Sequence, residues 1–261
     1  MEDKPANPHS TRGENERKVF QRDRTPHIFR PIDFRSVRVR NRITMSPMCQ
    51  YSAEDGAPGD WHFQHLYSRA VGGAGIVFTE SVAIEPRALI TSHCLGLWND
   101  QQRDAYARIA RAIKSAGAAP AIQLNHAGRK GAVGRPWEGG KPLGPNDGAW
   151  PLIAPSALAF GEGYQMPTAL DAKTIAQTLE LYAVAARRAR EAGFQIVEVH
   201  AAHGYLTHEF LSPLANRRTD NYGGSFENRT RFLREAIAAV HTEWPDELPL
   251  FVRISATDWA E

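Results

Sequence analysis

Cysteine, long apolar runs and an amino-terminal targeting pattern are scarce or missing in this sequence. Its 261 residues include two cysteines, Cys49 and Cys94, which are too few for a disulfide scaffold and are typical of a reducing compartment. No apolar stretch approaches the length of a transmembrane helix. The early acidic residues Glu2, Asp3 and Glu14 argue against a transit peptide, and no signal-peptide core accompanies them. We therefore expect a cytoplasmic protein with no membrane partner.

A surplus of charge of either sign is also absent. The 31 Lys and Arg residues and 29 Asp and Glu residues leave a net charge of +2 at pH 7, too small to favour nucleic acid as a partner. The hydrophobic share of 42% and the charged share of 23% are typical of a globular protein with a sizeable core. We expect the polar residues 1–27 to be a disordered extension and residues 28–261 to form one domain.

A dinucleotide-binding fingerprint is missing as well. The glycine cluster at residues 72–75 precedes a predicted strand, whereas a phosphate-binding glycine loop follows one. These glycines are therefore expected to connect a helix to a strand.

Apolar periodicity predicts strands and helices in alternation. The expected strands are 42–46, 75–80, 119–125, 195–200 and 250–255. The expected helices are 61–71, 100–116, 171–193 and 225–240, with Asp100, Asp171 and Ser225 as N-caps of the last three. The long segment 126–170 is dense in Gly, Pro and Trp and lacks periodicity, which is typical of a lid or a binding loop.

This alternation predicts a parallel α/β sheet, and both an open doubly wound sheet and part of a barrel fit it. Polar residues recur at the carboxyl ends of the expected strands, namely Ser46, Cys49, Glu80, Ser81, Gln123, Asn125, His200, Arg253 and Ser255. Because a (β/α)8 TIM barrel builds its site from the carboxyl ends of many strands, this recurrence favours the barrel, with about the first five βα units present.

The fourth predicted strand ends in a cluster of ionisable aromatic residues. His200 closes the strand, and His203 and Tyr205 follow in the loop that it opens. Such groups are costly to bury without partners, so they are candidates for binding a ligand. A satisfied core histidine with a surface loop is the alternative. A metal site that adds His208 and Glu209 is another, although the H-E-x-x-H order is lacking and no metal is expected.

Four motifs in order along the chain resemble the Old Yellow Enzyme family, in the branch that has a cysteine beside the flavin. They are NRITMSPMCQY (41–51), IQLNHAGRK (122–130), the stretch 200–213 and RTDNYGGSFENR (218–229). The resemblance covers residues 28–259. It implies a barrel that binds FMN, takes hydride from NADPH or NADH, and reduces the C=C bond of small-molecule α,β-unsaturated carbonyl compounds.

The resemblance also implies roles for individual residues. The residues implied to contact the flavin are Ser46, Pro47, Met48, Cys49, Ser81, Gln123 and Arg253. His200 and His203 are implied to bind the carbonyl oxygen of an enone, and Tyr205 to donate a proton. Tyr51 and Lys130 are implied to line the substrate pocket.

Each of these roles has a simpler alternative. Arg253 can instead neutralise Glu198, since adjacent barrel strands can bring the two together. Cys49 can be a small buried apolar group and Gln123 a solvated strand end, while the 218–229 motif can be structural.

Five βα units do not close an eight-stranded barrel, and the resemblance implies that later strands hold the FMN phosphate. We therefore expect either a fragment of a longer polypeptide or a truncated product, and residues 1–261 alone should hold FMN weakly. An inactive remnant is an open alternative. So is the flavin domain of a larger dienoyl-CoA reductase or amine dehydrogenase, although an iron–sulfur cysteine cluster is lacking. The complete enzyme is expected to be a homodimer or homotetramer.

Overall fold

The computed structural model describes residues 25–260, and its centre is a parallel five-stranded sheet. The strands follow the order β3 (Thr44–Met45), β4 (Ile76–Ala83), β5 (Ala119–Asn125), β8 (Ile196–Ala201) and β9 (Leu250–Ile254). Neighbours in the sheet are therefore consecutive crossover units, as in one side of a (β/α)8 barrel, which confirms the predicted fold class. Most of the predicted disordered extension, residues 1–24, lies outside the described residues.

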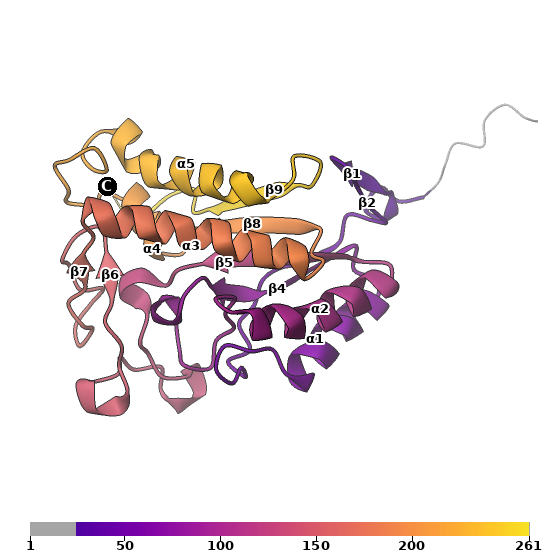
Figure 1. Ribbon diagram of the computed structural model, residues 1–261, viewed down its shortest axis with the longest axis horizontal. Coiled ribbons are helices and arrows are strands. Elements are labelled where there is room, and N and C mark those ends of the chain that lie inside the picture. The colour runs from indigo at the N-terminus through magenta and orange to yellow at the C-terminus, as the bar shows by residue number, and fades with distance from the viewer. Residues whose placement is uncertain (1–24, 261) are drawn as a thin grey trace, which may run out of the picture.

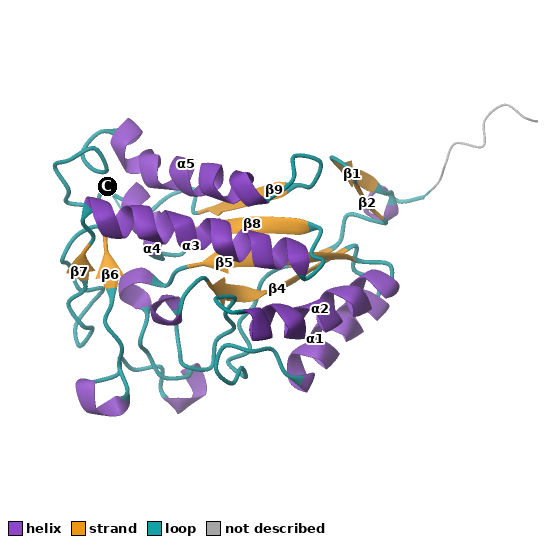
Figure 2. Ribbon diagram, viewed as in Figure 1, coloured by secondary structure: helices purple, strands orange, loops and turns teal. Residues whose placement is uncertain are grey.

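Four long helices cover one face of this sheet (Figures 1 and 2). They are α1 (Asp60–Val71), α2 (Asp100–Ser115), α3 (Ala172–Glu191) and α5 (Phe226–Glu243). The caps of α3 and α5 are the predicted ones, since Asp171 and Ser225 accept from the backbone N–H three residues on. The predicted cap of α2 was wrong by one residue. Asn99 accepts from Gln102 N at 2.8 Å, and Asp100 is the first helical residue.

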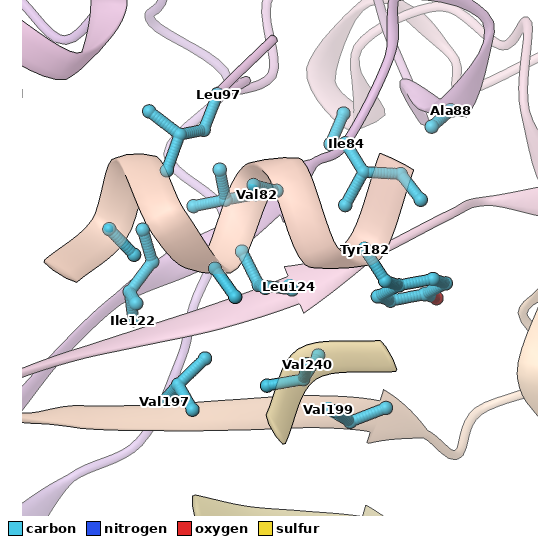
Figure 3. Close-up of a cluster of buried hydrophobic side chains, with 14 of the residues drawn as sticks. Val82, Ile84, Ala88, Leu97, Ile122, Leu124, Tyr182, Val197, Val199 and Val240 are labelled. Carbon is cyan, nitrogen blue, oxygen red and sulfur yellow. The ribbon is translucent and has the colours of Figure 1, made fainter. Parts of the chain in front are cut away.

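Side-chain alternation along the strands builds the main core between sheet and helices. Figure 3 shows Ile122 and Leu124 of β5 beside Val197 and Val199 of β8 in this layer. Tyr182 of α3 is fully buried there, with its hydroxyl 3.1 Å from the Thr207 hydroxyl. Within residues 25–260, no helix has both the length and the apolar character needed to cross a bilayer.

A second core lies on the inner face of the sheet, near its amino end. The strands contribute Ile76, Phe78, Ala119, Ala121 and Ile196 to it. An antiparallel hairpin, β1 (Ile32–Phe34) with β2 (Val37–Val39), packs against these residues and was missed by the sequence analysis. The hairpin covers the amino end of the sheet, so the carboxyl end is left for a site.

Four further parts of the chain differ from expectation. Strand β3 is shorter than residues 42–46, since only Thr44 and Met45 pair with β4. Strand β4 is longer and carries a bulge between Phe78 and Ser81. A short helix, α4 (Leu206–Leu211), follows β8. The expected loop 126–170 contains three 3-10 turns and one small parallel pair, β6 (Ile153–Ala154) with β7 (Thr168–Ala169).

We expect Leu124→Ala to lower the free energy of unfolding by about 2–5 kcal/mol, because Leu124 is fully buried against the helices and its loss leaves a cavity. Urea denaturation followed by circular dichroism measures the change. The control is Val71→Ala on α1, where the side chain is 62% exposed and the expected change is within about 0.5 kcal/mol. Equal effects of the two substitutions would contradict this assignment of the core.

Candidate active site

A row of polar side chains crosses the inner face of the sheet above the second core. Strand register places Ser81 of β4 beside Gln123 of β5, and Gln123 beside Glu198 of β8. Gln123 Nε2 donates to Glu198 Oε1 at 2.6 Å, and all three residues are buried. Burial raises the pKa of Glu198 despite this hydrogen bond. Among the described residues, Glu198 forms no ion pair with Arg253, although the Arg253 charge lowers the pKa of Glu198. Gln123 is buried and is not a solvated strand end.

The next row toward the carboxyl end pairs His200 of β8 with Arg253 of β9. His200 is 3% exposed, and burial lowers its pKa to about 3, with further lowering by His203 and Arg253. His200 is therefore a neutral imidazole at physiological pH. Among the described residues, His200 Nδ1 has no hydrogen-bond partner and the half-buried Arg253 guanidinium has no ion pair or hydrogen bond. Both groups are available to a ligand.

His200, His203 and Tyr205 form one cluster of rings, as the sequence analysis predicted. The ring centroid of His200 lies 5.0 Å from that of His203 and 5.2 Å from that of Tyr205, both in edge-on geometry. His203 adopts a left-handed backbone (φ 61°), and its N–H donates to Ser255 Oγ at 3.0 Å. Burial raises the pKa of Tyr205, and Cys49 and Tyr51 raise it further, so the phenol keeps its proton.

The metal alternative is not supported, because His208 and Glu209 have other partners. His208 Nδ1 accepts from Gly204 N at 2.7 Å, and its Nε2 lies 3.1 Å from an Asp258 carboxylate oxygen. Glu209 Oε1 accepts from Arg129 N at 2.9 Å. Across residues 25–260, no group of His, Cys, Asp and Glu side chains is arranged to hold a metal ion.

Lys130 reaches the same cluster from the loop after β5. Its Nζ donates to the His203 carbonyl at 2.9 Å and lies 5.2 Å from the centroid of the Tyr205 ring. Phe160, which the sequence analysis did not identify, is 4.8 Å away from the same nitrogen. Burial lowers the pKa of Lys130. The segment 126–170 therefore contributes directly to the site, as expected of a binding loop.

The segment after β3 also bears on this cluster, because, in addition to burial, Cys49 and Tyr51 raise the pKa of Tyr205. Ser46 and Met48 are exposed, and Pro47 and Cys49 are half-buried. Tyr51 has a left-handed backbone (φ 51°), and its ring packs edge-on against Trp137 at 5.8 Å. Burial raises the pKa of Tyr51 to about 12.

Glu209 is a feature of the site that the sequence analysis considered only as a metal ligand. The residue is 1% exposed, and its Oε2 has no partner. A Cβ at Gly128 (φ 59°) would lie 2.2 Å from Glu209 Oε1, so only glycine fits there. The carboxyl group thus fixes the loop that carries Lys130 over Tyr205.

Comparison with known proteins agrees with this geometry. The sequence profile of the NADH:flavin oxidoreductase / NADH oxidase family matches residues 27–261. The chain belongs to this family. The NADPH dehydrogenase of Bacillus subtilis (strain 168) is 44% identical over 236 residues, which are 90% of this chain and 65% of that protein. The NADPH dehydrogenase of Geobacillus sp. (strain WCH70) is 47% identical over 89% of this chain and 64% of its own length. The chain therefore spans just under two thirds of these relatives.

Solved structures of the NADH:flavin oxidoreductase family share the fold. Morphinone reductase superposes with a TM-score of 0.75 at 33% identity, over 88% of this chain and 62% of that one. The Old Yellow Enzyme homologue of Zymomonas mobilis superposes with a TM-score of 0.75 at 31% identity, over 88% of this chain and 63% of that one. These matches confirm the resemblance to the Old Yellow Enzyme family and the barrel architecture.

The residues present fit the FMN that this family uses. Ser81 Oγ, Asn125 Oδ1 and His200 Nδ1 are buried polar atoms without hydrogen-bond partners among the described residues. Arg253 adds an unpaired cation beside them. A flavin ring has carbonyl and N–H groups along one edge, and these would satisfy such donors and acceptors.

We expect Glu209 to make stability depend on pH. Burial raises the pKa of Glu209 from 4.5 to about 8, so folding favours its protonated form; this contribution is fully present below pH 4.5 and is lost as pH rises through about 8. Glu209→Gln keeps an acceptor for Arg129 N and removes the titration. The wild type should therefore lose more stability than this variant across that range, measured by urea midpoints. Glu180→Gln on the exposed side of α3 is the control, and equal pH slopes for the wild type and Glu209→Gln would contradict the assignment.

Proposed function

We propose that this chain forms the flavin- and substrate-binding part of an FMN-dependent NAD(P)H oxidoreductase that reduces the C=C bond of α,β-unsaturated carbonyl compounds. The observation that carries the proposal is the ring cluster, in which the neutral His200 lies 5.2 Å from the protonated Tyr205. A neutral hydrogen-bond donor and a proton donor in one place suit the reduction of a polarised alkene.

The inner rows of the sheet would hold the cofactor. Ser81 and Gln123 would bind the polar edge of the flavin, and Arg253 would lie near the ring atoms that become negative on reduction. Ser46, Pro47, Met48 and Cys49, which lie in one segment after β3, would line the opposite edge. When bound, FMN would supply the hydride that it has accepted from a nicotinamide.

The ring cluster would bind and protonate the substrate. His200 and His203 would donate hydrogen bonds to the carbonyl oxygen, drawing electron density from the alkene. Tyr205 would donate its phenolic proton to the α-carbon, from the side opposite the hydride. Lys130 holds the His203 backbone at 2.9 Å, and with Tyr51 it would limit the size of the pocket. The names of the relatives support NADPH as donor, with NADH as the alternative.

One comparison favours a second candidate, the reduction of an aromatic acyl-CoA substrate. 2-Naphthoyl-CoA reductase superposes with a TM-score of 0.77 at 30% identity, and the chain spans 35% of that larger protein. Competition between 2-cyclohexenone and an aromatic acyl-CoA in one assay separates the two candidates. We favour the enone, because the ring cluster of His200, His203 and Tyr205 suits a polarised alkene, and because the NADPH dehydrogenases, whose names mention no acyl-CoA, are matched over a larger share, 64–65% of their length.

We expect Tyr205→Phe in the FMN-loaded protein to slow alkene reduction by about 100- to 10,000-fold, the range typical of losing a general acid. Flavin reduction by NADPH should change little, since that half-reaction needs no proton from Tyr205. Stopped-flow absorbance measures the two half-reactions separately. Equal losses in both would overturn the role of Tyr205.

We expect His200→Ala to weaken the binding of p-hydroxybenzaldehyde, a phenol that mimics the enolate oxygen, by about 10- to 100-fold, because one hydrogen bond to a charged oxygen is lost. Titration of the long-wavelength flavin absorbance measures the affinity. His241→Ala on the exposed end of α5 is the control and should bind like the wild type. Unchanged affinity in His200→Ala would remove His200 from the substrate site.

A further inference from the structure

Two cations lie beside one aromatic ring next to the ring cluster. Lys130 Nζ is 4.8 Å and Arg129 Cζ is 5.8 Å from the ring centroid of Phe160. The Phe160 ring is itself supported by Tyr164, which packs edge-on with centroids 5.0 Å apart. Lys130 Nζ is also 5.2 Å from the centroid of the Tyr205 ring. The ammonium group therefore lies close to both the candidate proton donor and Phe160.

Hydrogen bonds to backbone carbonyls hold these two cations without neutralising them. Arg129 Nη1 donates to the carbonyls of Leu158 and Ala159, at 3.2 and 3.4 Å. Lys130 Nζ donates to the His203 carbonyl at 2.9 Å, and an ammonium has two further N–H groups to donate. Arg129 Nε is buried and has no hydrogen-bond partner among the described residues. Both side chains are thus fixed in place and have donors to spare.

The carboxyl groups of the site do not balance its positive charge. Within residues 25–260, Arg129, Lys130 and Arg253 form no ion pair with a carboxylate. Glu198 and Glu209 are buried in the same region, and burial raises the pKa of both, that of Glu209 to about 8. Burial therefore disfavours the negative charges that would offset the three cations. A ligand with a negative charge would supply what the site lacks.

We propose that the site takes an α,β-unsaturated carbonyl compound that carries a carboxylate in addition to its activating carbonyl, and that Lys130 binds this carboxylate. The proposal rests on the proposed function, in which His200 and His203 bind the activating carbonyl. The His200 ring centroid and Lys130 Nζ each lie 5.2 Å from the Tyr205 centroid. A ligand that is bound by His200 and extends past Tyr205 therefore comes within reach of the ammonium.

The half-buried position of Lys130 makes an ionic contact there stronger than one on the surface. Burial lowers the pKa of Lys130, because the ammonium loses hydration. A carboxylate would replace that hydration with a charge-assisted hydrogen bond. The phosphates of a nicotinamide donor are another source of negative charge. The position of Lys130 beside Tyr205 favours the alkene substrate, to which Tyr205 is proposed to donate its proton.

The test compares two phenols that differ in charge and little in shape, 4-hydroxyphenylacetate and its methyl ester. A methylene separates the ring from the carboxyl group in both, so the two phenol groups have similar acidity. Isothermal titration calorimetry measures their binding to the 261-residue chain in saturating FMN. We expect the wild type to bind the carboxylate about 3- to 30-fold more tightly than the ester. The preference should shrink in about 0.5 M salt, because dissolved ions screen the pair.

Variants connect this preference to Lys130. Lys130→Met keeps an unbranched side chain and removes the charge, so the carboxylate and the ester should bind with nearly equal affinity. Lys130→Arg keeps the charge and should keep the preference. Lys141→Met, at an exposed position of the same 126–170 segment, is the matched control and should show the wild-type preference.

Four outcomes would overturn the proposal. They are equal affinities in the wild type, binding of neither phenol, a preference that survives in Lys130→Met, and an equal loss of both ligands in that variant. The last would mean that Lys130 serves only to hold the His203 backbone. Stopped-flow reduction of the flavin tests the other source of charge: weaker NADPH binding in Lys130→Met, with the carboxylate preference intact, would assign Lys130 to the donor instead.

These outcomes are separate from a failure of the proposed reaction. If the Tyr205→Phe experiment contradicts alkene reduction while the carboxylate preference follows Lys130, then the reaction is wrong and the selection of an anionic ligand stands. If alkene reduction depends on Tyr205 and the preference is absent, then only the inference about Lys130 fails.

Discussion

The two-residue period of the parallel strands is the constraint on which the rest of this structure depends. Along β5, Ile122 and Leu124 point to the helices, while Ala121, Gln123 and Asn125 point to the inner face. Outward residues are apolar throughout the strand, but inward ones change from apolar to polar toward the carboxyl end. One alternating pattern therefore builds the core and the site together, and a shift of one residue in register would exchange them.

Burial decides the electrostatic character of the site. Removing ionisable groups from water favours their neutral forms, so the pKa of His200 falls while those of Tyr205 and Glu209 rise. The result is a cluster of neutral hydrogen-bonding groups, in which Arg253 has no ion pair among the described residues. Because Tyr205 keeps its phenolic proton, such a cluster can bind a polar, planar molecule and supply a proton to it.

Local signals in the sequence predicted the long elements well. The alternation of strands and helices, the caps Asp171 and Ser225, and the strand 119–125 all agree with the structure. The hairpin β1–β2 and helix α4 were not predicted, because strands of three residues and a helix of six are too short to show a hydrophobic period. Asp100 was predicted as the N-cap of α2 in place of Asn99, because Asn and Asp are equally good N-cap residues and the two are adjacent.

The sequence by itself determined which chemical groups the protein has and their order along the chain, including His200 at the end of a strand and His203 and Tyr205 just after it. Only the tertiary structure decided their partners. Gln123 donates a hydrogen bond to the Glu198 carboxylate that Arg253 was a candidate to neutralise, and Lys130 donates to the His203 carbonyl. The physical reason is that such contacts join residues far apart in the chain. Strand register and the paths of irregular loops determine these contacts, and neither can be predicted from the local propensity of a short stretch of sequence.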